Sequence, residues 1–165
     1  MKKLSLLFVA AIGITCFSGC EKKPKADMMM HCTYSVPDTD TGVYTSSADF
    51  TYVSETDELV SGNIFHNYEN YPKDQYNNKV LTDLTIRKTK FDELEGVKIE
   101  LSRTETEFGS KENWDFPSID LEAAIQLDEE QEKFIDTDAG YYSLNKTKDY
   151  YESHNYACSI SDIKE

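Results

Sequence analysis

The stretch Met30-His31-Cys32-Thr33-Tyr34-Ser35-Val36 alternates large apolar or aromatic side chains with polar ones. A period of two is typical of a half-buried β-strand, and it places Met30, Cys32 and Tyr34 on one face. Near the other end of the chain, Tyr156-Ala157-Cys158-Ser159-Ile160 alternates in the same way. We therefore expect the folded region to begin and end with strands that each carry one cysteine beside their apolar residues.

Further strands are predicted between these two. Residues 43–53 and 59–68 are rich in β-branched and aromatic residues and are joined by turn-forming residues. Together with the first strand they predict an antiparallel meander. Residues 97–102 alternate as another strand, and residues 113–116 begin its partner, with a turn predicted at 108–111.

Two helices are also predicted. Apolar residues at helical spacing indicate a helix over 73–94, which Gly96 would end. Ser143 can cap a second helix that runs from Leu144 to about Ser153. Residues 127–134 are acidic and fit either a short helix or a loop. We therefore predict an α+β fold, in which an antiparallel β-sheet of about five to six strands carries two helices packed on one face.

The N-terminus predicts export and lipid attachment. Met1-Lys2-Lys3 precedes an apolar run from Leu4 to Phe17, and Ser18-Gly19-Cys20 follows. A short basic start, a brief apolar core and small residues before a cysteine are typical of a secretory signal. The segment Ser18-Gly19-Cys20 resembles the lipobox of bacterial lipoproteins. The apolar run from Leu4 to Phe17 is shorter than the about 20 residues that a membrane-spanning helix needs. An ordinary cleaved signal peptide with a free Cys20 is the alternative.

This leader sets the expected organisation of the chain. Residues 1–19 would be a lipoprotein signal peptide, residues 20–28 the lipidated Cys20 with a flexible tether, and residues 29–165 a single α+β domain. Each buried methylene of an acyl chain contributes about 0.8 kcal/mol, so two or three chains anchor stably. We expect the protein to be lipid-anchored at the cell membrane, on its extracytoplasmic face.

The remaining cysteines are expected to form a disulfide. Cys16 lies in the leader and Cys20 would carry the lipid, which leaves Cys32 and Cys158 as a pair. A pair of cysteines in an exported chain favours a bridge. It would close a loop of about 127 residues and stabilise the fold by on the order of 5 kcal/mol in the chain-entropy model. Two separate buried thiols are the alternative.

The charge excludes one class of partner. Loss of Lys2 and Lys3 with the leader would move the formal net charge from −14 to −16. Phosphate backbones would be repelled, so no nucleic acid is expected as a partner. The balance would suit cationic partners or divalent ions, although acidity most often serves solubility alone.

The sequence contains no motif for catalysis, metal or cofactor binding, and we predict none of the three. The three histidines lack the spacing of a zinc protease helix, and the glycines form no phosphate or dinucleotide loop. Asp38–Gly42 and Asp136–Gly140 resemble the start of a calcium loop, but each has its glycine one position early and no glutamate at position twelve. Both are expected to be turns.

Tyrosine is unusually frequent, with 11 residues, seven of which gather at positions 68–76, 141–142 and 150–151. Exposed tyrosines would suit contact with a protein or a carbohydrate. The alternative is that they fill strand faces and keep their hydroxyls at the rim.

Four short segments carry a family resemblance: the lipobox at Cys20, His31-Cys32-Thr33-Tyr34, Leu94-Glu95-Gly96-Val97 and Tyr156-Ala157-Cys158. On these the chain resembles small bacterial lipoproteins of unknown function, the YehR-like group. The resemblance spans most of the mature chain. It implies an α+β sheet domain without known catalytic residues.

Three functional hypotheses follow. We expect a membrane-anchored lipoprotein with a non-enzymatic binding or envelope-associated domain, whose protein or small-molecule partner is unidentified. The first alternative is a lipid-anchored hydrolase with a site built from distant residues, such as His66 and Glu69 with a nearby Asp or Tyr. The second is an accessory ligand-binding protein of a transporter. Converging histidines and carboxylates would favour the hydrolase. A shallow tyrosine-rich face would favour the binding domain, and an enclosed apolar cavity would favour the ligand-binding accessory protein.

Overall fold

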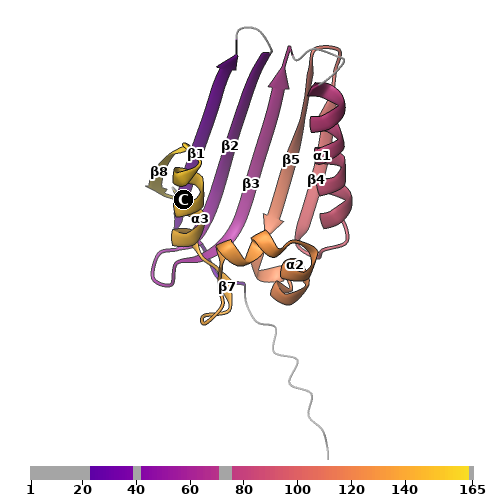
Figure 1. Cartoon of the computed structure of the whole chain (residues 1–165). Coiled ribbons are helices and arrows are strands. Elements are labelled where there is room, and N and C mark those ends of the chain that lie inside the picture. The colour runs from indigo at the N-terminus through magenta and orange to yellow at the C-terminus, as the bar shows by residue number, and fades with distance from the viewer. Residues whose placement is uncertain (1–22, 39–41, 71–75, 164–165) are drawn as a thin grey trace, which may run out of the picture.

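The computed structural model of the chain describes residues 23–38, 42–70 and 76–163 (Figure 1). The elements in chain order are β1 (Met28–Asp38), β2 (Gly42–Val53), β3 (Glu58–Glu69), α1 (Tyr76–Phe91), β4 (Val97–Arg103), β5 (Glu107–Asp115), η1 (Phe116–Ser118), α2 (Leu121–Leu127), η2 (Glu129–Phe134), β6 (Ile135–Asp136), β7 (Tyr141–Tyr142), α3 (Leu144–Ser153) and β8 (Ala157–Asp162). The predicted leader and Cys20 lie outside the described residues. In the described part, none of the helices is long and apolar enough to cross a membrane.

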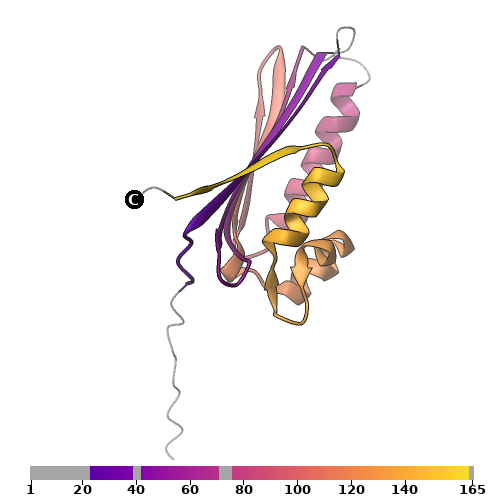
Figure 2. The same ribbon diagram turned by 90° about the vertical axis from the view of Figure 1, so that its left-hand side faces the viewer.

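Six strands form one antiparallel sheet in the order β4-β5-β3-β2-β1-β8. The helices lie together on one face of this sheet (Figure 2). The predicted α+β fold is therefore confirmed, with α1 and α3 as the two predicted helices and α2 in addition. The short ribbon of β6 and β7 was not predicted.

The alternation of the sequence decides which face of the sheet is covered. On β2, Ala48 and Phe50 are 0% and 2% exposed, and on β1 Met30 and Cys32 are both fully buried. The opposite face carries polar pairs such as the half-buried His31 and Asp49, whose Nδ1 and Oδ1 are 2.6 Å apart. One apolar face and one polar face are typical of an antiparallel sheet that faces water on one side.

The predicted disulfide is confirmed. Cys32 and Cys158 stand directly opposite each other in the register of β1 and β8, and their Cα atoms are 4.1 Å apart in the bridge. Tyr34 on β1 stacks on Tyr156 just before β8, with ring centroids 5.1 Å apart. The first and last strands of the sheet are thus paired neighbours.

The start of α3 is held by two side chains. The hydroxyl of Ser143 accepts a hydrogen bond from the backbone of Lys146 at 3.3 Å. Asp57, in the turn before β3, accepts from the Ser143 hydroxyl at 2.5 Å and from the backbone of Asn145 at 3.1 Å. These bonds satisfy N–H groups that the first helical turn leaves free, and they tie α3 to the sheet.

One local prediction is wrong. Residues 108–111 do not turn but belong to β5, where Gly109 pairs with Asn67 of β3. A Cβ atom at Gly109 would lie 2.0 Å from the carbonyl oxygen of His66. The glycine permits a close approach of two backbones inside the sheet, and it does not mark a turn. Residues 127–134, left open between helix and loop, form the end of α2 and the short helix η2.

The described part of the predicted tether contacts the domain. The ammonium of Lys23 contacts the carboxylate of Asp115 and lies 3.0 Å from the hydroxyl of Ser118. Asp27 accepts hydrogen bonds from the backbone and the hydroxyl of Ser54 at 2.8 and 2.5 Å. The chain therefore enters the fold at the end of the sheet that also carries η1.

Candidate functional site

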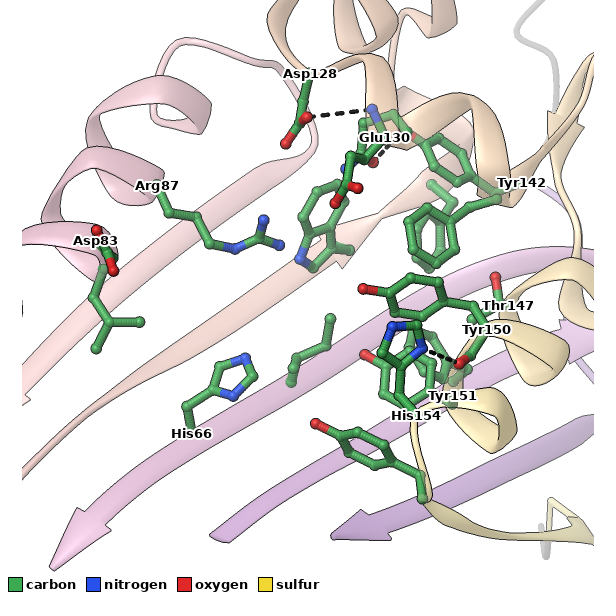
Figure 3. A pocket seen from close by; sticks show the side chains of 18 of the residues that line it. His66, Asp83, Arg87, Asp128, Glu130, Tyr142, Thr147, Tyr150, Tyr151 and His154 are labelled. Carbon is green, nitrogen blue, oxygen red and sulfur yellow. Dashed lines mark hydrogen bonds between the residues drawn. The ribbon is translucent and has the colours of Figure 1, made fainter. Parts of the chain in front are cut away.

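A cavity of about 470 Å³ lies between the helix-covered face of the sheet, α1, η2 and α3 (Figure 3). We call it the groove. It exists because α1 packs over β4 and β5 while α3 packs against β8 and η2. The central strands β2 and β3 lie between the two helices and remain partly open. Its size is in the range of pockets that hold one small organic molecule.

The floor of the groove is apolar. It is formed by four large side chains of the sheet and the segment after it: Phe50, Ile64, Trp114 and Phe116. Each is at most 9% exposed over the whole residue. Trp114 is the only tryptophan of the chain, so its fluorescence reports on this floor.

Tyrosines form much of the wall: Tyr44, Tyr68, Tyr142, Tyr150, Tyr151 and Tyr156. Several of their rings contact one another. Tyr44 lies against Tyr68 with centroids 4.6 Å apart, and Tyr151 meets Tyr156 edge-on at 4.7 Å. Such ring pairs contribute about 0.5–1.5 kcal/mol each beyond the area they bury. The wall is therefore a packed aromatic surface.

Burial affects the protonation of three of these tyrosines. Desolvation raises the pKa of Tyr44, Tyr142 and Tyr151 well above the ordinary value for a phenol. Their hydroxyl groups therefore stay protonated at neutral pH and can donate hydrogen bonds.

Arg87 of α1 and Glu112 of β5 form an ion pair beside the floor. Nε and Nη2 of Arg87 donate to the two carboxylate oxygens of Glu112 at 2.6 and 2.9 Å, and the indole Nε1 of Trp114 donates to Oε2 at 3.0 Å. The Glu112 side chain is fully buried, while that of Arg87 is 34% exposed. The groove therefore contains a guanidinium whose charge is already balanced.

The pKa directions of this pair follow from its geometry. Burial acts to raise the pKa of Glu112, but the hydrogen bonds and charge of Arg87 outweigh it and hold that pKa below its ordinary value. Burial likewise opposes the charge of Arg87, and the bonds to Glu112 outweigh it, so the pKa of Arg87 is raised. Both groups are charged at neutral pH. A bidentate pair of this kind fixes α1 on the sheet.

His66 lies on the floor side of β3 and shares a hydrogen bond with Tyr44, whose Oη is 2.8 Å from its Nδ1. Burial is the main cause that lowers the pKa of His66 below its ordinary value. The imidazole is therefore neutral at pH 7. His66 therefore contributes a neutral hydrogen-bonding group to the lining of the groove.

The predicted combination of His66 with Glu69 is not assembled. Residues three apart on a strand point to opposite faces, and Glu69 accepts a hydrogen bond from Asn67 at 2.9 Å. His66 faces the groove (Figure 3). The two residues proposed for a hydrolase are thus on opposite sides of the sheet.

Carboxylates stand at the rim. Asp128 lies 3.5 Å from Lys90 and Glu130 lies 2.7 Å from Lys133, while Asp83 is an exposed residue on the groove side of α1. Within residues 23–38, 42–70 and 76–163, no group of three or more His, Cys, Asp or Glu residues is placed to hold a metal ion. At the second loop tested for calcium, the Asp136 carboxylate accepts two backbone N–H groups at 3.1 Å each. That loop is a turn, as predicted.

One buried hydroxyl in the groove has no partner. Thr147 of α3 is 2% exposed, and its Oγ1 makes no hydrogen bond to any residue that the structure describes. It lies beside Tyr150 on the α3 side (Figure 3). A buried hydroxyl without a partner costs about 1–3 kcal/mol, so a ligand that bonds to it would recover part of that cost.

Sequence reasoning missed Arg87, Glu112, Asp128 and Thr147. A signal for Glu112 exists in the sequence, because Glu112 lies between Ser110 and Trp114 among the alternate residues of β5 that face the core. A charged residue in that phase of a strand indicates a partner on the element packed above it. No comparable pattern in the sequence points to Arg87, Asp128 or Thr147.

Comparisons with known proteins give a family and a fold. A family model described as "Domain of unknown function (DUF8824)" matches residues 20–164. No curated protein matches the chain.

Two solved structures are similar. The NMR structure of the Escherichia coli YehR protein is 11% identical, covers 86% of this chain and 94% of its own, and has a TM-score of 0.53. The NMR structure of a protein from Streptococcus pneumoniae TIGR4 is 16% identical, covers 96% of this chain and 98% of its own, and has a TM-score of 0.48. The resemblance to YehR-like proteins is therefore confirmed at the level of the fold.

Proposed function

Because this chain belongs to the DUF8824 family of domains of unknown function, we propose its function from its own residues. It is a membrane-anchored extracytoplasmic lipoprotein, and its domain binds a small ligand in the groove without catalysing a reaction. The observation that carries the binding role is the half-open aromatic groove of about 470 Å³.

Two features support the membrane anchor and the export that it requires. Ser18-Gly19-Cys20 follows a basic start and an apolar run, which is typical of a lipid-attachment signal. The disulfide between Cys32 and Cys158 suits an oxidising compartment outside the cytoplasm. Acyl chains on Cys20 would hold the protein at the membrane, and the segment from Lys23 would position the domain.

The chemistry of the groove supports binding without catalysis. Arg87 and Glu112 line or adjoin the groove as a buried ion pair joined by two hydrogen bonds, so the charge of each is balanced by the other. His66 bonds to a tyrosine, and the Glu69 proposed as its catalytic partner points away. An apolar floor with a few hydrogen-bonding groups is what small-molecule binding sites share.

A role as the ligand-binding accessory of a transporter is the second candidate. The apolar floor of the groove favours it, because a carrier must shield an apolar body from water. The two candidates share the same binding site and differ in the partner that receives the ligand.

The anchor is tested by labelling cells that express the full chain with an alkyne fatty acid. The wild-type protein is expected to carry the label and to sediment with membranes, whereas Cys20→Ala is expected to lose both properties. A labelled Cys20→Ala variant, or wild-type protein found unlabelled in the cytosol, would contradict the proposal.

The binding role is tested with the full chain in lipid nanodiscs. Extracts of small molecules are fractionated, and Trp114 fluorescence and the thermal unfolding midpoint identify a bound fraction. We expect a saturable fluorescence change and recovery of the ligand unchanged after release. A ligand that is recovered chemically converted would favour the hydrolase instead.

A further inference from the structure

We propose that the groove selects a small organic cation, with an aromatic or aliphatic body on the apolar floor and an ammonium group between Asp128 and Glu130. The inference rests on the proposed binding function and specifies the chemical class of its ligand.

The body of the ligand is set by the floor. Phe50, Ile64 and Trp114 form a surface with no group that demands a polar partner, since the indole N–H of Trp114 already bonds to Glu112. A sugar or a nucleotide would lose the hydration of its hydroxyls there. An alkyl chain or an aromatic ring would gain about 25 cal/mol for each Å² removed from water.

The sign of the ligand's charge follows from the groove's own charges. Four charged side chains line it: Asp83, Arg87, Asp128 and Glu130. The charge of Arg87 is balanced by Glu112, and Asp128 and Glu130 pair with Lys90 and Lys133 outside the groove. The lining itself therefore carries three carboxylates and one guanidinium. The formal net charge of −14 for the whole chain adds to the same field. An anionic ligand would be repelled, and a cation would be attracted.

The position of the ammonium group follows from the η2 end of the groove. Asp128 precedes η2 and Glu130 lies in its first turn, and both side chains line the groove at that end (Figure 3). Their ion pairs reach outward to Lys90 and Lys133, neither of which lines the groove. The pair of Glu130 with Lys133 is exposed and contributes little. The Asp128 side chain is 23% exposed, and its Oδ1 also accepts from the backbone of Glu130 at 3.3 Å. Each carboxylate keeps further acceptor sites.

Aromatic rings complete this end. Tyr150 packs edge-on against Phe134 with centroids 4.7 Å apart and lies 4.2 Å from the ring of His154. Burial is the main cause that raises the pKa of Tyr150; the negative charge of Glu130 adds to the rise and the positive charge of Lys133 opposes it. A cation placed beside Glu130 therefore also meets a tyrosine ring, an arrangement that is favourable for ammonium groups.

The hydroxyl of Thr147 is an independent observation that points to a bound ligand. This hydroxyl is buried in the groove without a hydrogen bond among the described residues. A polar group on the ligand, such as an ammonium N–H, would satisfy it. The groove thus combines an apolar floor, an acidic end and one unfilled acceptor.

The test uses three probes that share one body: phenylbutylamine, phenylbutanol and phenylbutyrate. Each is titrated into the full chain in nanodiscs of neutral lipid, and Trp114 fluorescence and calorimetry give the Kd. We expect the amine to bind about tenfold more tightly than the alcohol and the carboxylate to bind most weakly. Equal affinity of amine and alcohol would overturn the selectivity for cations while leaving the binding role intact.

Matched variants locate the ammonium site. Asp128→Asn and Glu130→Gln each remove one charge and keep the side-chain size, and both are expected to abolish most of the preference for the amine without changing the affinity for the alcohol. Glu132→Gln is the control, because Glu132 lies on the exposed side of η2 and does not line the groove. An amine affinity that Asp128→Asn and Glu130→Gln leave unchanged, or that Glu132→Gln weakens as much, would refute the proposed position. Failure of all three probes to bind would refute the ligand class, and the extract screen would still test the binding role.

Discussion

Replacing Arg87 by Met leaves the carboxylate of Glu112 buried with only the indole N–H of Trp114 as a partner. Glu112 is fully buried, and Arg87 supplies two of its three side-chain hydrogen bonds. Removal of one member of a buried ion pair costs about 3–5 kcal/mol. The Arg87 side chain remains 34% exposed, and solvent screening places our expectation at the lower end, about 3 kcal/mol at pH 7.

The pH dependence of that loss identifies its cause. In the wild type the folded pKa of Glu112 is lowered, so its contribution to the free energy of unfolding is present above the unfolded pKa. That contribution is lost as pH falls through the lower folded value. In Arg87→Met, burial outweighs the remaining hydrogen bond from Trp114 and raises the folded pKa of Glu112. The variant should therefore become less stable as pH rises from about 4.5 towards 7, by about 1.4 kcal/mol for each unit of the shift.

Urea denaturation of the full chain at pH 5 and pH 7 measures both effects. The double variant Arg87→Met with Glu112→Gln is the control, because the amide oxygen still accepts from Trp114 and no charge is buried. We expect it to recover most of the lost stability at pH 7. A loss of less than about 1 kcal/mol in Arg87→Met, or a loss that is equal at both pH values, would refute the claim that Arg87 neutralises Glu112.

Further substitutions test other parts of the structure by urea denaturation. Cys32→Ala together with Cys158→Ala is expected to lower the free energy of unfolding by about 2–5 kcal/mol, and no loss would mean that the bridge does not form in the cell. Thr147→Val removes an unpartnered buried hydroxyl and should stabilise the empty domain by about 1 kcal/mol while weakening the binding of phenylbutylamine; a destabilised domain would show that the hydroxyl has a partner. Gly109→Ala should cost more than about 3 kcal/mol, because its Cβ would lie 2.0 Å from a backbone oxygen, whereas Gly140→Ala meets no atom within 4 Å and should lose only about 1 kcal/mol from its φ of +78°. Equal losses at the two glycines would contradict the close backbone approach at Gly109.

Local patterns in the sequence predict much of the fold. The alternation around Cys32 and Cys158 predicts two strands with cysteines on matching faces, and the register of β1 and β8 confirms it. The cap at Ser143 predicts the start of α3 for a similar reason, since a side chain and a backbone N–H three residues later suffice. Such features depend on residues close in sequence or on a strict period.

The groove depends on features that no local pattern contains. Arg87 and Glu112 meet only because α1 packs over β5, and the sequence of neither segment indicates that the other is its partner. Gly109 looks like a turn residue, and its role becomes visible only when β3 lies beside it. The opening between α1 and α3 results from where the two helices rest on the sheet, which is a property of the packed molecule.

The position of a bound ligand tests the central claim most directly. In a ¹H–¹⁵N NMR titration of the full chain with phenylbutylamine, the single indole N–H signal of Trp114 should shift together with the backbone amides of η2 and α3. The amides of His31, Asp49 and Thr51, whose side chains lie on the opposite face of the sheet, should keep their positions. Shifts confined to that opposite face, or an indole signal that does not move at saturation, would contradict a ligand site in the groove.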